Sequence, residues 1–581
     1  MSILIKTVRI SGFRGLENIE VELEQTTVLT GMNNTGKTSF LKALQIALGN
    51  RQFISQDDFF IKNNDCATNI TIDVLIVPVD AKGKQEDRFS DDWEALLTTD
   101  RIRTDGTESF FPLRTHVTFD AIKNSYKVEQ TILQVWPDFT DWLNAGKGNK
   151  TRFHFDELPF FYMDAQRDIL EDTKLRGSYL GKMLSKIEYS PADIQAIEQQ
   201  IEQLNEKAVS SSNILSHIKE TLKGLDSALE NTRSGIELTP FTKKTRDLNK
   251  GLTIYYGDSQ DSFSMEYHGM GTRSWSSLLT LKSFIGLLAS NAEKVGSVFF
   301  PILAIEEPEA HLHPNAQKQL YSQINDIAGQ KIISTHSPYI AAVADLGQIR
   351  SFYKDQEGTR CDKVAIDSLT DEDQRKITRH VINSRGEIFF SKLMVLFEGE
   401  TEEQALPIFA KHHFGKSVVE MGVDFIGVGG YGNYLPFLRF AESLNIPWLI
   451  LSDAEEKTRT SVKKQFADCH SAKTEADVIV FLDNGNDIEK QLIEDGFQYE
   501  IRQALIDERD AYHSEQEKTS AQAKINAYDN DELYTQIKKS KTQFAPVIAE
   551  QIIKSKKPLP PKIIKLFDKI SSILNITEEA S

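Results

Sequence analysis

The pattern of apolar and polar positions predicts an α/β protein. Apolar and polar residues alternate in segments 3–10 and 19–23, which is typical of strands with one buried face. Segments 27–30, 298–306 and 331–335 each contain adjacent apolar residues, as in Val28-Leu29 and Ile332-Ile333, which is typical of strands buried on both faces. Each of these three is followed by a segment rich in glycine, proline or polar residues. We therefore expect strand–loop–helix units through the first two thirds of the chain.

Helical spacing is clearest in two places. After the first buried strand, residues 39–48 place apolar side chains on one face of a predicted helix. Between about 187 and 229 the chain is polar, nearly free of glycine and spaced like amphipathic helices. This stretch predicts a helical insertion, too short and too irregular for a long coiled coil. A second α/β unit begins near residue 392 with a buried strand at 393–397, and a similar strand follows at 447–452.

Length and composition limit the possible classes of protein. The 581 residues predict about three to five domain-sized units. No uninterrupted apolar run reaches the ~20 residues that cross a bilayer, and the N-terminus lacks a secretory signal, so we expect no membrane association. Three cysteines are too few for a disulfide framework, which favours a cytoplasmic location. The net charge of −18 argues against a surface that binds nucleic acid everywhere, but not against one basic channel.

The segment after the first buried strand fits the phosphate-binding loop pattern. Residues 31–38 read Gly-Met-Asn-Asn-Thr-Gly-Lys-Thr, between a predicted strand and a predicted helix. Glycines let the backbone wrap around phosphates, and the helix N-terminus supplies positive potential. We expect Lys37 to reach the β- and γ-phosphates of ATP and the Thr38 hydroxyl to coordinate Mg²⁺. The predicted ATP-binding residues of the loop are Asn33, Asn34, Gly36, Lys37, Thr38 and Ser39.

Two later strands are predicted to complete the nucleotide site. The apolar strand at 302–305 is followed by Glu306 and Glu307. Glu306 would hold Mg²⁺, directly or through water, and Glu307 would act as the catalytic residue that polarises the attacking water. The strand at 331–335 is followed by His336, which we expect near the γ-phosphate. Such residues are common after strands, so the interpretation depends on their combination with the phosphate loop.

Three acidic pairs follow in the second α/β unit. The first two lie at the ends of its buried strands, and the third lies further along the chain. The candidate metal ligands and catalytic carboxylates are Glu398, Glu402, Asp453, Glu455, Asp487 and Glu489. Clustered carboxylates repel one another unless a cation neutralises them, and two Mg²⁺ ions ~4 Å apart can clamp a reacting phosphodiester. The alternative is a set of solvated acids, which so acidic a chain would also contain.

The nucleotide motifs resemble the ATPase head shared by ABC transporters, SMC-like proteins and DNA-repair ATPases. In such heads a glycine-containing signature segment from a second protomer completes the ATP site, and residues 268–274 are the candidate here. Gln166 lies where this superfamily has its glutamine loop, and Arg14 follows the first strand as in SMC-like heads. His311 and His313 would allow a metal pair, but their segment matches the turn after the Walker B acids, so we expect no zinc there.

The second unit resembles a Toprim domain, the metal-binding fold shared by topoisomerases, primases and some nucleases. The resemblance rests on residues 395–402, Val-Leu-Phe-Glu-Gly-Glu-Thr-Glu, and on Asp453-Ala454-Glu455, where many Toprim domains have Asp-x-Asp. The glycine-rich segment 427–433 matches a strand end that lets the substrate backbone approach.

An SMC-like ATPase head followed directly by a Toprim domain resembles the OLD (overcoming lysogenisation defect) nucleases, together with the Gabija-type and retron-associated defence nucleases. This resemblance implies Mg²⁺- or Mn²⁺-dependent DNA cleavage by the acids named above. It also implies a catalytic lysine that stabilises charge on the scissile phosphate, for which Lys541 is the favoured candidate and Lys539 the second. Finally, it implies assembly through the ATPase region, with the helical insertion as a dimerisation element.

The expected fold is an ABC/SMC-like ATPase domain with a helical insertion, followed by a Toprim α/β domain. The expected domains are 1–169 (ATPase, N-terminal part), 170–250 (insertion), 251–390 (ATPase, C-terminal part) and 391–581 (Toprim with C-terminal helices). The expected function is ATP-regulated, divalent-metal-dependent DNA nicking or double-strand cleavage in bacterial anti-phage defence, by a homodimer or homotetramer. A helicase, or a retron reverse transcriptase with its DNA–RNA hybrid, is a candidate partner. The alternatives are an SMC-like DNA-repair ATPase or clamp without nuclease activity, and a decayed ATPase that only binds nucleotide.

Overall fold

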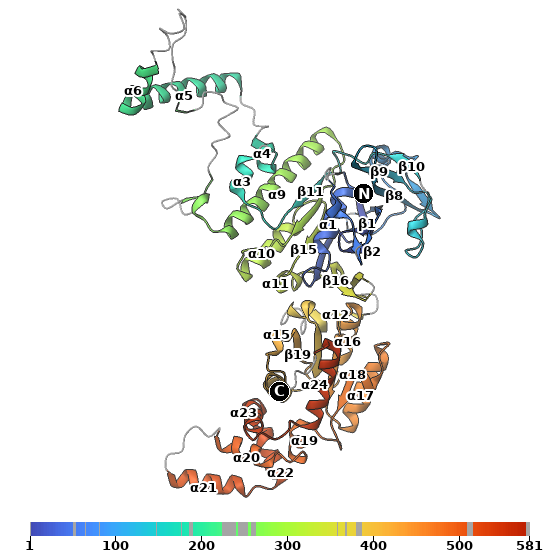
Figure 1. Cartoon of the computed structure of the whole chain (residues 1–581), viewed down its shortest axis with the longest axis vertical. Coiled ribbons are helices and arrows are strands. Elements are labelled where there is room, and N and C mark those ends of the chain that lie inside the picture. Colours follow the sequence, from blue (N-terminus) through green and yellow to red (C-terminus); the bar gives the residue numbers. More distant parts are fainter. Residues whose placement is uncertain are drawn as a thin grey trace, which may run out of the picture. The chain divides into compact units, whose positions relative to one another are not determined.

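The chain forms a mixed α/β structure, seen here in a computed structural model. The described residues are 2–49, 54–63, 65–80, 82–146, 148–175, 177–184, 190–222, 240–241, 254–256, 263–356, 358–365, 369–378, 386–507 and 515–576. Figure 1 shows the elements coloured along the sequence. The chain divides into two compact units: residues 1–154 with 330–581, and residues 155–329. Over the described ranges, no helix combines the length and apolar composition needed to cross a membrane.

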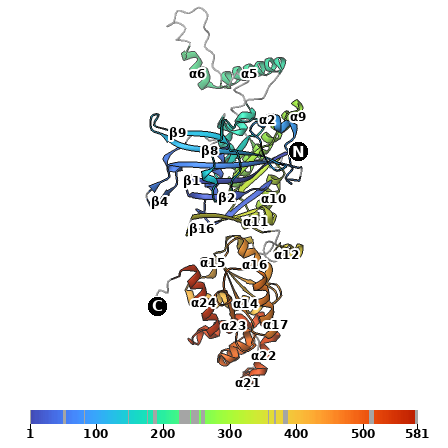
Figure 2. The same cartoon turned by 90° about the vertical axis from the view of Figure 1, so that its right-hand side faces the viewer.

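The N-terminal part of the first unit is built on an antiparallel sheet. Its strands, in spatial order, are β10 (Asn149–Thr151), β9 (Ser125–Ile132), β8 (Glu108–Asp120), β6 (Asn69–Val79), β1 (Ser2–Phe13) and β2 (Leu16–Glu22), with β7 (Arg103–Asp105) paired to β8. Figure 2 labels β9, β8, β1 and β2 in this sheet, in which β6 lies between β8 and β1. Asp73 of β6 faces Arg114 of β8, and the buried pair makes two hydrogen bonds of 2.7 Å. This pair joins the two central strands at a position that water does not reach.

Parallel strands carry the phosphate-binding loop. β3 (Thr26–Gly31) lies between β15 (Gln330–Ser334) and β16 (Ile349–Asp355), and both neighbours run parallel to it. β17 (Gly358–Lys363) pairs antiparallel with β16. Every residue of β3 is buried, in agreement with the buried strand predicted at 27–30. The helix after the loop, α1 (Lys37–Ala47), begins two residues earlier than the sequence pattern predicts, because the phosphate loop leads directly into it.

The second unit contains two parallel strands and a set of helices. β11 (Phe160–Met163) pairs with β14 (Ile302–Glu306). The helices are α3 (Ile169–Lys174), α4 (Tyr179–Leu184), α5 (Pro191–Ser211), α6 (Asn213–Leu222), α9 (Met270–Val295) and α10 (Pro314–Asn325). α3 and α4 lie against α9, and α5 packs on α6 (Figure 1). Helices α4 to α6 and all but the first residue of α3 lie within residues 170–250, the range expected for the helical insertion, of which residues 176, 185–189, 223–239 and 242–250 lie outside the described residues.

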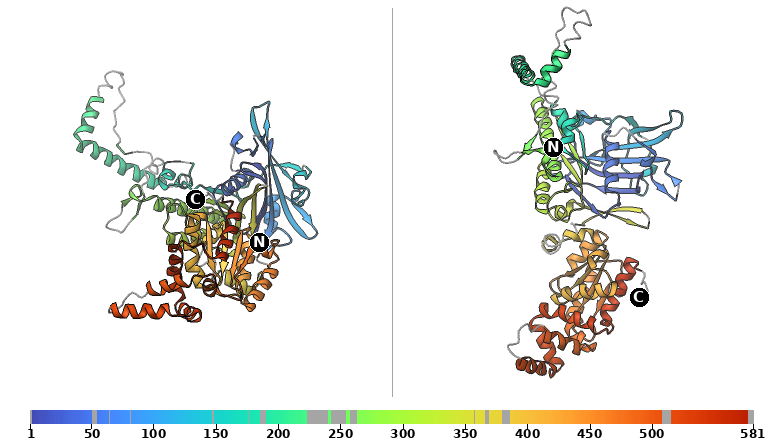
Figure 3. Two further views of the ribbon diagram at one scale, coloured as in Figure 1. Left: turned by 60° about the horizontal axis from the view of Figure 1, so that its bottom comes forward. Right: turned by 60° about the vertical axis from the view of Figure 1, so that its left-hand side comes forward.

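The C-terminal part of the first unit is built on a parallel sheet. Its strands, in spatial order, are β19 (Val423–Gly427), β18 (Leu393–Phe397), β20 (Trp448–Ser452) and β21 (Ile479–Phe481). The helices around it are α14 (Glu400–Phe414), α16 (Tyr434–Ser443), α17 (Glu456–Asp468) and α19 (Ile488–Glu494), and the C-terminal helices are α20 (Gln498–Asp507), α22 (Asn530–Lys539), α23 (Lys541–Lys554) and α24 (Pro561–Leu574). α23 packs on α14, and α24 lies against β18; both are red in Figure 3.

Candidate active site

The phosphate-binding loop has the geometry that the sequence predicts. α1 begins with Gly36 as its N-cap in a left-handed conformation, with φ of 99°. A Cβ atom at Gly31 would lie 2.1 Å from the carbonyl oxygen of Phe352, so the close approach of these strands requires glycine. The Nζ atom of Lys37 donates to the carbonyl oxygens of Gly31 and Met32 at 2.8 and 2.9 Å. The lysine is therefore already held within the loop.

The other predicted residues of the loop are accessible to a ligand. Asn33, Asn34 and Thr38 are exposed, and Ser39 is half-buried. His336 follows β15, which runs parallel to β3 and pairs with it. Since parallel strands end at the same edge of a sheet, His336 and the phosphate loop share one edge.

The turn after β1 also lies beside the phosphate loop. A Cβ atom at Gly36 would approach the Leu16 side chain to 2.6 Å. Arg14, in this turn, has a positive φ of 48°, and its guanidinium pairs with buried Asp58 at 2.8 Å. The arginine that resembles the one in SMC-like heads is therefore fixed by an ion pair near the loop.

The two acids predicted to act on the attacking water lie in the second unit. Glu306 is the buried last residue of β14, and Glu307 follows with a positive φ of 40°. Buried Arg167 donates to the carbonyl oxygen of Glu306 at 3.2 Å and to that of Pro308 at 2.6 Å. Burial lowers the pKa of Arg167 to about 10, although nearby carboxylates oppose this shift. Arg167 therefore fixes the backbone around the acids, whereas the predicted neighbour Gln166 is exposed.

The candidate signature segment lies at the start of α9. Arg273 pairs with Asp168, its Nε donating at 2.9 Å. A Cβ atom at Gly271 would lie 2.4 Å from the carbonyl oxygen of His311, so this glycine allows α9 to pack closely against that turn. The Nδ1 atom of His313 accepts a hydrogen bond at the N-terminus of α10. His313 thus caps a helix.

Carboxyl groups from two adjacent strands meet at one edge of the C-terminal parallel sheet. Glu398 follows β18, Glu402 lies in the first turn of α14, and Asp453 follows β20. β18 and β20 pair in parallel, so their ends lie together. Ser452 joins the two strand ends, because its hydroxyl donates to Glu398 Oε1 at 3.4 Å. Glu402 is buried, and the other two acids are partly exposed.

Burial and mutual repulsion raise the pKa of each of these acids. Burial raises the pKa of Asp453 to about 8, and four neighbouring acids add to the effect: Glu402, Glu398, Asp487 and Glu489. Burial also raises the pKa of Glu398 and of Glu402 to about 7. These groups therefore form one electrostatic cluster that holds protons near neutral pH unless a cation replaces them.

Glu455 lies at the margin of this cluster. It is exposed and directly precedes α17. Its charge contributes, after burial, to the raised pKa of Glu398. Glu455 therefore lies near enough to act on the cluster while facing solvent.

Glu489 contacts Lys541, the predicted catalytic lysine, and so links this lysine to the acid cluster. This buried acid lies in the first turn of α19, and the Thr401 hydroxyl donates to its Oε1 atom at 2.6 Å. Lys541 Nζ lies 2.9 Å from the same oxygen. Burial lowers the pKa of Lys541, but the bond to Glu489 outweighs this, so the net pKa is raised. Lys541 is therefore charged beside the acids.

Asp487 is held by the C-terminal helix α22. It caps α19 by accepting the Lys490 N–H at 3.0 Å, and its other oxygen accepts from the Tyr534 hydroxyl at 2.7 Å. Lys538 Nζ lies 2.7 Å from that oxygen. Burial raises the pKa of Asp487, but Lys538 and Tyr534 outweigh it and the net pKa is lowered. Lys539, the second lysine candidate, instead donates to Gln536 on its own helix at 3.4 Å.

The carboxylate oxygens of this cluster suit a hard divalent cation, although the side chains are not arranged around a single metal position. Among the residues that the structure describes, no three His, Cys, Asp or Glu side chains form a group that could hold a metal ion. Within that same part of the chain, Asp453 Oδ1 and Glu489 Oε2 are buried without a hydrogen-bond partner. Buried oxygens without partners are costly, and a cation would offset that cost. Carboxylate oxygens are ligands for Mg²⁺ and Mn²⁺.

Four residues of this cluster do not follow from the sequence motifs. Thr401 and Ser452 hydrogen-bond to the acids, and Lys538 pairs with Asp487. Tyr434 is buried next to the cluster; burial, followed by the charges of three acids, raises its pKa well above the usual value. Signals for some were present: Thr401 lies within the Glu-Gly-Glu-Thr-Glu motif, and Lys538 lies four residues after Tyr534 on α22, so both can reach Asp487.

Comparisons with known proteins agree with an ATPase domain followed by a Toprim domain. The family described as "AAA ATPase domain" matches residues 4–78 and 115–341, just over half of the chain. The family described as "Overcoming lysogenization defect protein-like, TOPRIM domain" matches residues 389–454, which include Glu398, Glu402 and Asp453.

Similar curated proteins carry nuclease names. The OLD nuclease of Thermus scotoductus is 26% identical over 80% of this chain and 86% of its own length. The Old nuclease of Escherichia phage P2 is 23% identical over 78% of each chain. Endonuclease GajA of Bacillus cereus is 23% identical over 28% of each chain.

The fold and the site define a protein in which a P-loop ATPase domain is joined to an acid-bearing Toprim domain. Both strand-end motifs are present, and both family matches fall on the elements that carry them. The chain belongs to the AAA ATPase domain family. It also carries an OLD-like Toprim domain, and it is similar to the OLD nucleases over most of its length.

Proposed function

We propose that this chain is an ATP-regulated, divalent-metal-dependent DNA endonuclease of bacterial anti-phage defence, which nicks DNA or cuts both strands. The observation that carries the proposal is the cluster of buried and partly buried acids at the ends of β18 and β20, with Lys541 bound to Glu489 beside it. The names of the similar proteins support a nuclease and, through GajA, an endonuclease.

The acids of the Toprim sheet would hold the cations. The proposed ligands are Glu398, Glu402, Asp453, Glu455, Asp487 and Glu489. Mg²⁺ or Mn²⁺ would supply an activated water and neutralise charge on the phosphodiester. Thr401 and Ser452 would orient the carboxylates through the hydrogen bonds that they already make. Lys541 would stabilise the negative charge that develops on the scissile phosphate.

The ATPase domain would regulate this site. Lys37 and the backbone N–H groups of the phosphate loop would bind the phosphates of ATP, and exposed Thr38 would coordinate its Mg²⁺. Glu306 would hold the cation, Glu307 would polarise the attacking water, and His336 would contact the γ-phosphate. The signature segment 268–274 of a second copy would complete the site.

The helices α5 and α6 support assembly of two or more copies. Leu204 of α5 and Ile214 of α6 are 54% and 73% exposed in a single chain. Exposed apolar side chains on adjacent helices favour burial against another protein surface. We therefore propose that this insertion contributes to a homodimer or homotetramer.

Plasmid cleavage tests the proposed function. Wild-type protein should convert supercoiled plasmid to nicked or linear DNA in Mg²⁺ or Mn²⁺ and should not do so in EDTA. Glu402→Gln should abolish cleavage and leave ATP binding intact, while Asp468→Asn, an acid on α17 outside the cluster, should cleave normally. Normal cleavage by Glu402→Gln would refute the assignment, and protection of cells from phage by wild type but not by this variant would support the defence role.

A further inference from the structure

Gly432 lies in the loop after β19, and neither its backbone conformation nor its neighbours among the described residues require glycine at this position. Gly429 and Gly430 have positive φ values of 71° and 122°, which favour glycine. Gly432 is not among the residues with positive φ, and no described atom comes within 4 Å of the place where its Cβ would lie. Neither backbone conformation nor packing among the described residues therefore excludes a side chain there. A molecule from outside can therefore approach the backbone closely at Gly432.

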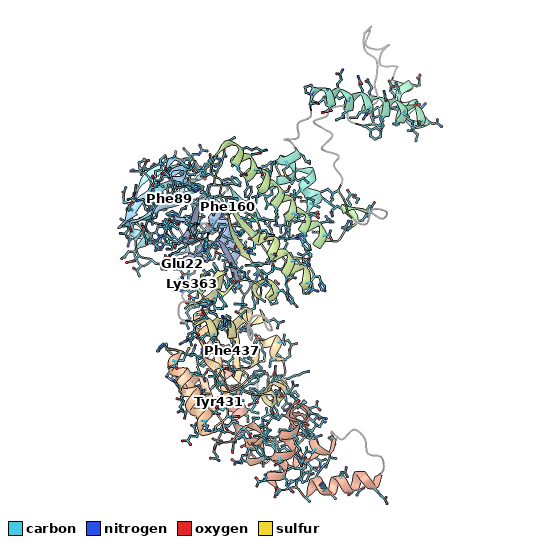
Figure 4. All side chains as sticks on the ribbon, turned by 180° about the vertical axis from the view of Figure 1, so that it is seen from behind. Glu22, Phe89, Phe160, Lys363, Tyr431 and Phe437 are labelled. Atoms are coloured by element: carbon cyan, nitrogen blue, oxygen red, sulfur yellow. The ribbon has the colours of Figure 1, made fainter. Side chains whose placement is uncertain are left out.

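This loop is held firmly beside the acid cluster. The N–H of Val428 donates to the carbonyl oxygen of Phe397, the residue before Glu398, at 2.8 Å. The amide of Gln465 and the hydroxyl of Ser461, both on α17, donate to the carbonyl oxygen of Tyr431 at 2.7 and 3.2 Å. The loop is thus joined to β18 on one side and to α17 on the other. Tyr431, labelled in Figure 4, is 45% exposed.

The helix that holds the loop has two basic flanks. Arg459 and Lys463 lie over the ring of Phe481 at 5.0 and 5.9 Å, and Lys463 also pairs with Glu475. Lys457 and Lys464 are exposed at positions i and i+7, on the flank of Ser461, which contacts the loop. One flank is therefore used for packing within the domain, and the other faces solvent beside the loop.

We propose that the exposed flank of α17 with Lys457 and Lys464, together with Gly432 and Tyr431, is the surface that guides a DNA strand into the acid cluster. The inference rests on the proposed nuclease function and adds the path of its substrate. Lys457 and Lys464 are about 10 Å apart along the helix axis, at 1.5 Å per residue. This distance spans about three phosphates of one strand at ~3.4 Å each along the duplex axis.

The charge of α17 suits a phosphate backbone. The helix carries four basic and two acidic side chains, and its exposed flank has Lys457 and Lys464 against Asp468, in a chain with a net charge of −18. Both lysines lie on the helix that directly follows Asp453 and Glu455, so a strand bound along α17 would lead to the cluster. At Gly432 the backbone of the protein can approach the strand closely, and the exposed ring of Tyr431 offers a face for stacking or for contact with a sugar.

Salt-dependent DNA binding tests this surface. We would measure the affinity of wild-type protein and the double variant K457Q/K464Q for a fluorescent duplex in Ca²⁺ by anisotropy, over a series of KCl concentrations. Loss of two phosphate contacts on this duplex should make the slope of log K against log salt shallower by about 1.8. In Mg²⁺, the KM for plasmid cleavage should rise severalfold with little change in kcat. Gly432→Glu should raise the KM similarly, with an unchanged Tm.

The double variant R459Q/K463Q is the matched control, because it removes the same charge from the other flank of the same helix. Its salt slope should equal that of the wild type. Equal slopes for wild type and K457Q/K464Q, or equal losses in both double variants, would overturn the inference. If the wild type binds DNA but does not cut it, the nuclease proposal fails, while the salt slopes still decide whether this flank binds DNA.

Discussion

Replacing Asp453 with Asn should stabilise the metal-free protein, and the gain should grow with pH. The pKa of Asp453 is raised from its ordinary value of 3.8 to about 8, mainly by burial and then by neighbouring acids. Between these values the folded chain retains a proton that the unfolded chain has released. The stability contributed by this raised pKa is therefore lost as pH rises from about 4 to about 8. Asparagine cannot ionise and removes this loss.

The size of the effect follows from the shift in pKa. About four units at about 1.4 kcal/mol each give an upper limit of about 6 kcal/mol above pH 8. About 4 kcal/mol of this develops between pH 5 and pH 8. Removing the charge of Asp453 also lets the neighbouring acids ionise more easily. The stability gained by the substitution is therefore spread over the coupled group and is smaller than the upper limit. We therefore expect a measured gain of about 2–4 kcal/mol at pH 8 and about 1 kcal/mol at pH 5.

Urea unfolding in EDTA at several pH values would measure this gain. Asp468→Asn, which removes an acid of α17 outside the cluster, is the matched control and should give a stability curve parallel to that of the wild type. Saturating Mg²⁺ should stabilise the wild type more than Asp453→Asn, because the variant lacks one carboxylate of the proposed site. Parallel curves for wild type and Asp453→Asn from pH 5 to pH 8 would refute the reasoning.

Four further predictions follow from the contacts described above. Lys541→Gln should lower kcat for plasmid cleavage by about 100-fold through loss of charge stabilisation, and an unchanged kcat would exclude that role. Lys37→Ala should weaken ATP binding at least about 10-fold in calorimetry, since a cation of the phosphate loop is lost; equal affinity would contradict it. Arg114→Met should lower the free energy of unfolding, measured in urea, by about 3–5 kcal/mol, because it leaves buried Asp73 unpaired. A decrease of less than about 1 kcal/mol would contradict this role of the ion pair. The affinity of the Toprim acids for Mg²⁺ should rise between pH 6 and pH 8 as Glu398 and Glu402 lose protons, whereas a flat calorimetric profile would argue against this cluster as the ligand set.

The site residues could be predicted from the sequence where a single residue follows a buried strand at the edge of a sheet. Glu398 and Asp453 each follow a continuous apolar run, and parallel pairing of β18 and β20 brings their ends together. The phosphate loop was equally clear, because the close approach at Gly31 and the left-handed Gly36 require the glycines of the motif. In both places local pattern and tertiary structure depend on the same few residues.

Contacts between distant elements could not be predicted in the same way. The bond between Thr401 and Glu489 joins residues 88 positions apart, and it depends on how α14 packs beside α19. Arg167, rather than Gln166, turns toward β14, because one residue of difference in a loop reverses the direction of a side chain. The contact of Lys538 with Asp487 does have a local signal, since Tyr534 and Lys538 are four residues apart on α22 and both contact this acid.

The central claim is that the acids at the ends of β18 and β20 hold divalent cations. Crystals grown with Mn²⁺ and measured near the manganese absorption edge would test it most directly. We expect an anomalous peak within coordination distance of carboxylate oxygens of Glu402 and Asp453, and no such peak in Asp453→Asn crystals. A protein that nicks plasmid in Mn²⁺ but shows its manganese away from these carboxylates would exclude them as the metal ligands.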